Sequence, residues 1–198
     1  MPVVKSRPVW GRLAPSPFAR RHLVFCEVAG LGAVERAFAG TDSIRQRTSL
    51  NLIVPPDFAP ARSERLDALG FEAVHEFPSV ETVLVRLRVS LSQAAMGTLL
   101  YLAGGEAFLD QATCLAEACG VAGDGVQTEH CGSTGRRVQC VHCKGMMADV
   151  TMSPVVCDHC GLHLTVRDHY SRRLGAFQGV CADAEAPGVL PEPTRIDA

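Results

Sequence analysis

Several features that would identify a function directly are missing from this chain of 198 residues. Its formal net charge is −2, so no excess of positive charge makes nucleic acid its main partner. No apolar run approaches the roughly 20 residues that a membrane-spanning helix needs, and Met1–Arg7 lacks the apolar core of a signal peptide. A Ser-His-Asp arrangement, a paired-carboxylate motif and a phosphate-binding loop are also absent. We therefore expect no membrane association, no export and no hydrolytic active site.

Aromatic residues are scarce as well, at 6% of the chain, whereas cysteines number nine. Hydrophobic residues make up 47%, which is enough for a folded protein with disorder confined to its ends. An odd number of cysteines, four of them in metal-binding spacing, is typical of a reducing compartment. The composition therefore predicts a folded cytoplasmic protein.

Four of the cysteines form two C-x-x-C hooks, at Cys140–Cys143 and Cys157–Cys160, separated by thirteen residues. Each hook can direct two thiolates at one point, so the pair predicts a tetrahedral four-sulphur site in a small zinc ribbon. Zinc or a single rubredoxin-type iron suits such a site; two disulfides or reduced thiol pairs are the alternative. His142 and His159 lie inside the hooks, and we expect both to point away because four cysteines already satisfy the metal.

The chain before the hooks alternates between strand and helix patterns. A proline-rich arm comes first, and its Trp10 is expected to anchor on the chain's own surface. The pattern predicts a doubly wound, mainly parallel α/β sheet of five strands. The strands are expected at 22–27, 49–54, 71–77, 97–103 and 126–130, and the helices at 33–39, 64–69, 80–91 and 106–119.

One helix has the clearest period, with Val80, Val83, Leu84, Leu87 and Leu91 on a single apolar stripe. Arg86 and Arg88 lie off that stripe and should be solvated. We divide the chain into an extended arm at 1–20, the α/β domain at 21–131, the ribbon at 136–166 and a polar, partner-binding tail at 167–198.

Two glycine turns follow predicted strands: Gly30 and Gly32 after the first, and Gly104 and Gly105 after the fourth. Ligands of open α/β sheets bind beyond the carboxyl ends of strands, where glycine lets a phosphate approach the backbone. The four glycines are therefore the candidate cofactor-binding residues. Neither turn is a full fingerprint, and Glu35 would repel a pyrophosphate, so tight turns are the alternative.

The segments Tyr101–Asp110 and Val126–His130 resemble the last third of a ferredoxin-reductase nicotinamide domain, and Glu129 matches its closing glutamate. This resemblance implies a sheet like the NAD domain of that family, with a possible NAD(P)H site at the glycine turns. Ala103 and Gly105 stand where the family has the cysteine and proline of its C-G-P motif. Only about 20 residues precede the domain, where the family has a flavin-binding barrel.

The reductase-like half, the four-cysteine ribbon and the segments Asp168–Phe177 and Asp183–Gly188 together resemble the A subunit of bacterial dimethylamine monooxygenase. The resemblance implies a complex with a haem-containing oxygenase subunit and a flavin, iron–sulphur reductase subunit. Such a complex oxidises dimethylamine to methylamine and formaldehyde with NAD(P)H and oxygen.

Three roles for this chain remain open from the sequence. The first is a non-catalytic docking subunit whose ribbon holds Zn²⁺. The second is a rubredoxin-like electron carrier with one iron; rubredoxin hooks read C-x-x-C-G, which Gly161 satisfies and Lys144 does not, so zinc is favoured. The third is a free-standing zinc-ribbon interaction protein.

Overall fold

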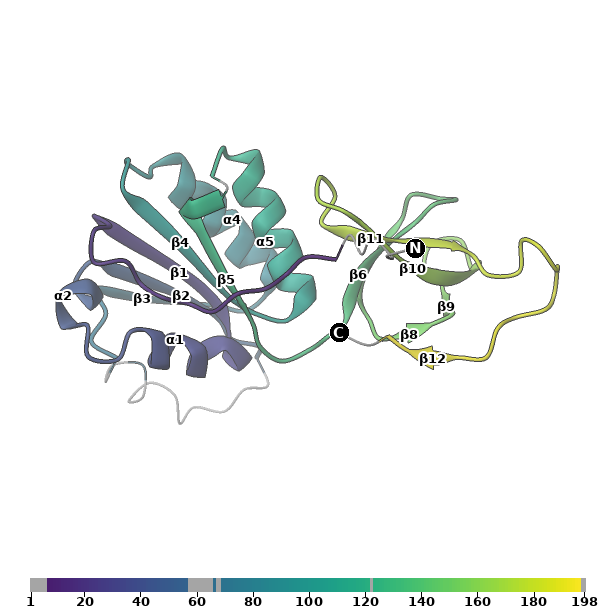
Figure 1. Cartoon of the computed structure of the whole chain (residues 1–198), viewed down its shortest axis with the longest axis horizontal. Coiled ribbons are helices and arrows are strands. Elements are labelled where there is room, and N and C mark those ends of the chain that lie inside the picture. Colours follow the sequence, from purple (N-terminus) through teal and green to yellow (C-terminus); the bar gives the residue numbers. More distant parts are fainter. Residues whose placement is uncertain (1–6, 57–65, 67–68, 122, 197–198) are drawn as a thin grey trace, which may run out of the picture. The chain divides into compact units, whose positions relative to one another are not determined.

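The structure, a computed structural model, describes residues 7–56, 66, 69–121 and 123–196. The chain forms two compact units (Figure 1). One is the α/β unit, Trp10–Gly132, and the other is the C-terminal unit, Ser133–Ala198 together with Met1–Val9. None of the helices in the described ranges has the length and hydrophobicity of a membrane span.

A five-stranded sheet organises the α/β unit, in the order β3-β2-β1-β4-β5, and all of its strands run parallel. This is the doubly wound order, in which the chain starts at the centre and builds toward both edges. The predicted fold class is confirmed. The strands are β1 (Arg21–Glu27), β2 (Thr48–Ile53), β3 (Ala73–Phe77), β4 (Thr98–Gly104) and β5 (Val126–His130).

Helices cover both faces of this sheet, each over its own apolar cluster (Figure 1). The short 3-10 helix η1 (Val28–Gly30), α1 (Leu31–Ala37) and α2 (Asp42–Arg45) lie on one side, and α4 (Val80–Ser92) and α5 (Glu106–Ala118) on the other, with η2 (Gly123–Gly125) before β5. The central strands are buried on both sides, as their apolar runs predict. The helix expected at 64–69 falls mostly outside the described residues.

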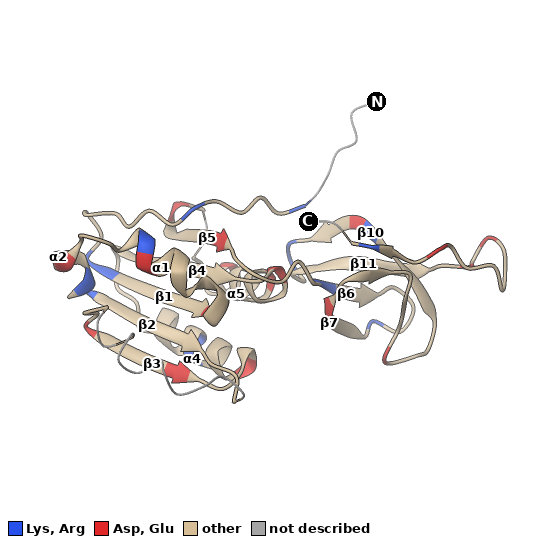
Figure 2. Cartoon of the chain, turned by 90° about the horizontal axis from the view of Figure 1, so that it is seen from below, with Lys and Arg blue, Asp and Glu red and all other residues tan. Residues whose placement is uncertain are grey.

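The N-terminal arm follows β5 within the α/β unit (Figures 1 and 2). Gly11 N–H donates to the Thr128 carbonyl at 3.0 Å, and Leu13 N–H donates to the Glu129 carboxylate at 2.8 Å. Trp10 packs against the apolar cluster under α4 and α5, which confirms the predicted anchor on the chain's own surface. The arm therefore protects an edge strand that would otherwise present unpaired backbone groups.

The C-terminal unit is a second five-stranded sheet, in the order β7-β6-β11-β10-β9. Only the β6–β11 pair is parallel. A further pair joins β8 and β12. The strands are β6 (Arg136–Cys140), β7 (Met146–Val150), β8 (Met152–Ser153), β9 (Val155–Val156), β10 (His163–Ser171), β11 (Ala176–Cys181) and β12 (Thr194–Arg195).

The prediction of a ribbon that ends at 166, followed by a polar tail, is wrong. Strand β10 runs through that boundary, and β11 lies at the centre of the sheet. The unit also has an apolar core of its own, which includes Val138, Leu164 and Phe177. The sequence of this segment is polar because its basic residues surround the turn between β10 and β11, while its buried residues are few and lie mostly in β11, at Ala176, Phe177 and Gly179.

Asp168 on β10 joins three distant parts of the C-terminal unit. Its carboxylate accepts hydrogen bonds from Arg7 at 2.8 Å and from Arg136 at 3.0 Å. Arg136 is buried and lies 4.4 Å from the centre of the Phe177 ring, which provides a cation–π contact. Although partial burial opposes ionisation, the hydrogen bonds and charges of Arg7 and Arg136 hold the pKa of Asp168 below its usual value. The carboxylate therefore stays ionised and compensates the buried guanidinium.

A buried histidine occupies the start of β1. His22 Nδ1 lies 3.0 Å from the Tyr101 hydroxyl, and the two rings stack with centroids 5.5 Å apart. Burial, assisted by the positive charge of Arg47, lowers the pKa of His22 from 6.5 to about 4. The folded chain therefore holds this side chain neutral.

Stability of the α/β unit should consequently fall in acid. Between its folded pKa of about 4 and its unfolded pKa of 6.5, His22 binds a proton only in the unfolded state. The stability present above pH 6.5 is thus lost toward pH 4, by up to about 3 kcal/mol. Urea unfolding followed by Trp10 fluorescence should show a weaker pH dependence for His22→Asn than for the wild type. His75→Asn is the control, because His75 is exposed, and it should keep the wild-type pH dependence. If the free energy of unfolding varied with pH equally in all three proteins, the acid sensitivity would not come from His22.

Candidate metal centre

The two cysteine hooks have the same backbone arrangement. Cys140 N–H donates to the Gly145 carbonyl and Cys157 N–H donates to the Leu162 carbonyl, both at 2.9 Å. In the opposite direction, Lys144 N–H donates to the Cys140 carbonyl and Gly161 N–H donates to the Cys157 carbonyl, again at 2.9 Å. One loop follows β6 and the other follows β9, so both strands hold the hooks in place.

This arrangement brings the sulphur atoms of Cys140, Cys143, Cys157 and Cys160 within 4.8 Å of one another. The Cys140–Cys160 and Cys143–Cys157 sulphur distances are 3.8 and 3.7 Å. A tetrahedral zinc ion with bonds of about 2.3 Å to sulphur requires sulphur–sulphur distances of roughly 3.8 Å. The four cysteines predicted from spacing are therefore brought together, and the cluster could hold a metal ion. All nine cysteines are free thiols, so the disulfide alternative is not what this structure shows.

The thiols influence one another's ionisation. Burial opposes ionisation of Cys157, but backbone hydrogen bonds from His159 and Cys160 outweigh it and lower its pKa to about 7. A backbone hydrogen bond from Leu162 favours ionisation of Cys160, yet burial and the neighbouring sulphurs raise its pKa to about 12. Cys160 therefore keeps its proton at neutral pH unless a cation compensates its thiolate, which is the electrostatic property expected of a metal-binding cluster.

The residue after each hook takes the same left-handed backbone conformation. Gly161 has a φ of 74° and Lys144 a φ of 62°. Lysine occupies this region at a steric cost of about 1 kcal/mol or more, and its ammonium group donates to the Val141 carbonyl at 2.6 Å. Because the two loops have equivalent backbones, Lys144 does not distinguish a zinc site from a rubredoxin-type site. The geometry fits either metal.

Neither hook histidine belongs to the sulphur cluster. His159 Nε2 lies 3.0 Å from the Met146 carbonyl oxygen, and its ring covers Gly145 so closely that a side chain there would collide with it. His142 is exposed. Both histidines lie outside the ligand set, as expected from the presence of four cysteines.

The glycine turns are arranged around a carboxylate. Gly105 N–H, at the start of α5, donates to Glu27 Oε2 at 2.6 Å. A β-carbon at Gly104 would meet the same oxygen, and one at Gly30 would come within 2.5 Å of the Ala103 carbonyl oxygen. Gly32 faces open space. Close packing between the ends of β1 and β4 therefore accounts for Gly30 and Gly104, and Gly32 takes no part in it.

This arrangement does not fit a nicotinamide dinucleotide. The N-terminus of a helix after a parallel strand is where a pyrophosphate would bind, but the Glu27 carboxylate already occupies that end of α5. Glu129, the expected closing glutamate, is bound to Leu13 N–H and to Arg36 at 2.6 Å. Sequence reasoning missed Glu27, although a carboxylate at the carboxyl end of an otherwise apolar strand was a usable signal.

A doubly wound α/β unit followed by a β unit with a closed four-cysteine cluster defines the class of this protein. Residues 2–126 match the family described as dimethylamine monooxygenase subunit DmmA-like, N-terminal domain, and residues 137–180 match the corresponding C-terminal domain. The chain belongs to this family. The resemblance to the dimethylamine monooxygenase A subunit is confirmed.

A curated relative is the heme-dependent oxidative N-demethylase delta subunit of Ectopseudomonas mendocina (strain ymp). It is 40% identical over 121 residues, which cover 60% of this chain and 69% of the relative.

Two solved cytochrome P450 structures are also similar. An intact type IV self-sufficient monooxygenase has a TM-score of 0.45 and 22% identity, over 70% of this chain and 20% of that chain. CYP116B46 from Tepidiphilus thermophilus has a TM-score of 0.46 and 19% identity, over 66% of this chain and 18% of its own. This chain thus spans about a fifth of either enzyme, and no functional conclusion follows from scores this low.

If Glu27 is a structural cap, Glu27→Ala should destabilise the α/β unit by about 1 kcal/mol, because the α5 N-terminus loses an anionic acceptor. Glu27→Gln keeps an acceptor without the charge and should lose less. Glu117→Ala, at an exposed position near the other end of α5, serves as the control. Unfolding followed by Trp10 fluorescence measures the change. Saturable NADH or NADPH binding by the wild-type chain at micromolar concentration would contradict the structural interpretation.

Proposed function

We propose that this chain is a non-catalytic, zinc-stabilised docking subunit of a haem-dependent dimethylamine monooxygenase. The observation that carries the proposal is the convergence of four thiol sulphurs within 4.8 Å of one another, with two of the pairs at 3.8 and 3.7 Å. A metal bound by four cysteines has no open coordination position, so it can stabilise a fold but cannot activate water or bind a substrate. Membership of the DmmA-like family supports the assignment to an amine-oxidising complex.

Cys140, Cys143, Cys157 and Cys160 would hold the zinc ion. When bound, zinc supplies charge that four clustered thiolates need and ties the two hook loops together. Cys140 and Cys157 also belong to the apolar core of the C-terminal unit. Metal binding is therefore expected to couple directly to the folding of that core.

The redox groups are assigned to partner chains. In this proposal the haem lies in an oxygenase subunit, and the flavin and iron–sulphur cluster lie in a reductase subunit that consumes NAD(P)H. The complex converts dimethylamine to methylamine and formaldehyde with oxygen, and this chain supports electron transfer between the two subunits by docking them. The capped N-terminus of α5 supports a role without nucleotide binding. We place the complex in the cytoplasm, because a thiolate site requires reduced cysteines.

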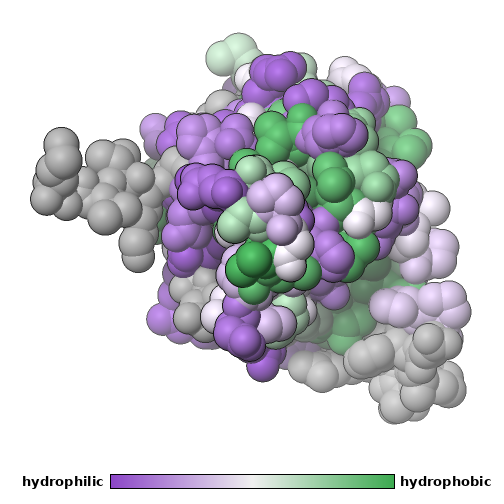
Figure 3. Space-filling view, turned by 90° about the vertical axis from the view of Figure 1, so that its right-hand side faces the viewer, coloured by the Kyte–Doolittle hydropathy of each residue, from purple (hydrophilic) through white to green (hydrophobic). Residues whose placement is uncertain are grey.

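Apolar side chains exposed on the C-terminal unit support a docking role. They include Val141 within the first hook and Val156 directly before the second, together with Met152, Val189 and Leu190. Figure 3 shows apolar residues gathered among hydrophilic ones on the face that it views. Valine, leucine and methionine at such positions are suited to burial against a partner.

A second candidate function is electron transfer through a single iron held by the same cysteines. The left-handed backbone of Lys144 is compatible with it, because this conformation gives the first hook the same backbone as a C-x-x-C-G loop. Iron and zinc fit the four sulphurs equally well. The two candidates therefore differ in the metal that the purified protein contains.

The docking proposal predicts the behaviour of Cys157→Ser in the co-expressed complex. The variant should lose its metal, lose hydrogen-exchange protection in β6 and β9, and dissociate from its partners. The unfolding transition of the α/β unit, followed by Trp10 fluorescence, should remain. The matched control, Cys181→Ser, alters a cysteine of the same unit that lies outside the cluster and donates to Asp183 at 3.1 Å. It should keep metal and partners.

Intact assembly of the metal-free Cys157→Ser protein would overturn the docking role. Purification of the wild-type chain from its native host without any haem or flavin protein would instead favour a free-standing zinc-ribbon interaction protein.

A further inference from the structure

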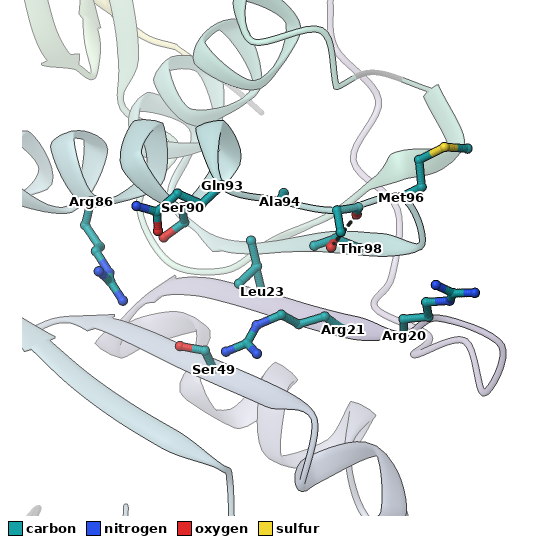
Figure 4. A pocket seen from close by; sticks show the side chains of 11 residues that line it. Arg20, Arg21, Leu23, Ser49, Arg86, Ser90, Gln93, Ala94, Met96 and Thr98 are labelled. Carbon is teal, nitrogen blue, oxygen red and sulfur yellow. Dashed lines mark hydrogen bonds between the residues drawn. The ribbon is translucent and has the colours of Figure 1, made fainter.

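A pocket of about 300 Å³ opens at the amino-terminal ends of β1 and β4, beside α4 (Figure 4). It lies entirely within the α/β unit, at the end of the sheet opposite to the glycine turns. Its polar lining includes Arg21, Arg86, Ser49, Ser90, Gln93 and Thr98. The described residues that line it include no aspartate or glutamate, so the lining is positively charged.

Arg86 gives the clearest indication of a ligand. The sequence predicts that Arg86 and Arg88 are both solvated; Arg88 is exposed, whereas Arg86 is only partly exposed. Its Nε atom is buried and has no hydrogen-bond partner among the described residues. A buried donor without an acceptor is costly, most of all on a charged group. An acceptor in the pocket would remove that cost.

Arg21 directs a second positive charge toward the same space. Figure 4 shows the guanidinium groups of Arg21 and Arg86 entering the pocket from β1 and α4, whereas the side chain of Arg20 points away. Arg21 also pairs with Glu72 at 3.5 Å, but the two side chains are 50% and 43% exposed. An ion pair this exposed contributes little and can exchange for another anion.

We propose that this pocket binds the phosphate or carboxylate group of a small ligand. Guanidinium groups donate two parallel hydrogen bonds to such oxyanions, and the hydroxyl groups of Ser49 and Ser90 add donors from β2 and α4. No aromatic side chain lines the pocket among the described residues, so nothing in it would stack on a nucleobase. The volume suits a compact anion and lies at the lower end of the range for small-molecule sites. This inference does not depend on the docking role proposed above.

Calorimetric titration of the full-length chain with inorganic phosphate, and separately with malonate, tests the proposal. At least one anion should bind saturably, and the tighter one identifies the ligand class. Arg86→Met should weaken that binding about tenfold, the effect of one lost charge-assisted hydrogen-bond pair. Arg21→Met should weaken it similarly, and this second variant covers the case in which Arg86→Met fails to fold.

Arg88→Met is the matched control, because it removes the same charge from an exposed position on the same helix. It should change the affinity by less than about twofold. Equal weakening by Arg86→Met and Arg88→Met would reduce the effect to diffuse electrostatics and overturn the proposal. The absence of saturable binding for both anions would also overturn it.

Discussion

The convergence of four cysteine sulphurs is the constraint on which the C-terminal unit depends. Two loops separated by thirteen residues must present their thiols within 4.8 Å of one another, and the strands before them fix their positions. Cys140 and Cys157 are simultaneously core residues, so packing and metal binding are two aspects of one structure. A metal held by four sulphurs has no position for a reacting molecule, which supports the structural role that we propose.

In the α/β unit, the positions at which related sheets bind ligands are occupied by the chain's own side chains. Its sheet has the strand order of dinucleotide-binding folds, yet Glu27 occupies the helix terminus that would receive a phosphate. The Glu129 carboxylate likewise accepts hydrogen bonds from Arg36 and from Leu13 N–H in the N-terminal arm. The strand order of a dinucleotide-binding sheet is thus present, while the positions at which such sheets bind a phosphate serve internal contacts. This use of the sheet agrees with our proposal that other chains of the complex carry the catalytic groups.

Local patterns predicted most of the α/β unit. The apolar run of β4 and the helical period of α4 are signals that neighbouring residues carry by themselves. The spacing of the cysteines likewise predicted the cluster of four sulphurs. Strands β10 and β11 escaped prediction because their burial depends on distant partners, such as Arg136 against Asp168 and Phe177. Glu27 and Arg86 were missed for the same reason, since only the fold shows what surrounds them.

The metal content and absorption spectrum of the full-length chain test the central claim most directly. Metal analysis after expression in medium supplied with both zinc and iron should find zinc in a one-to-one ratio, and the protein should be colourless. The native complex should add a Soret band and flavin absorption from its other chains without changing that ratio. A red protein that contains iron and bleaches with dithionite would contradict the structural role and establish an electron carrier.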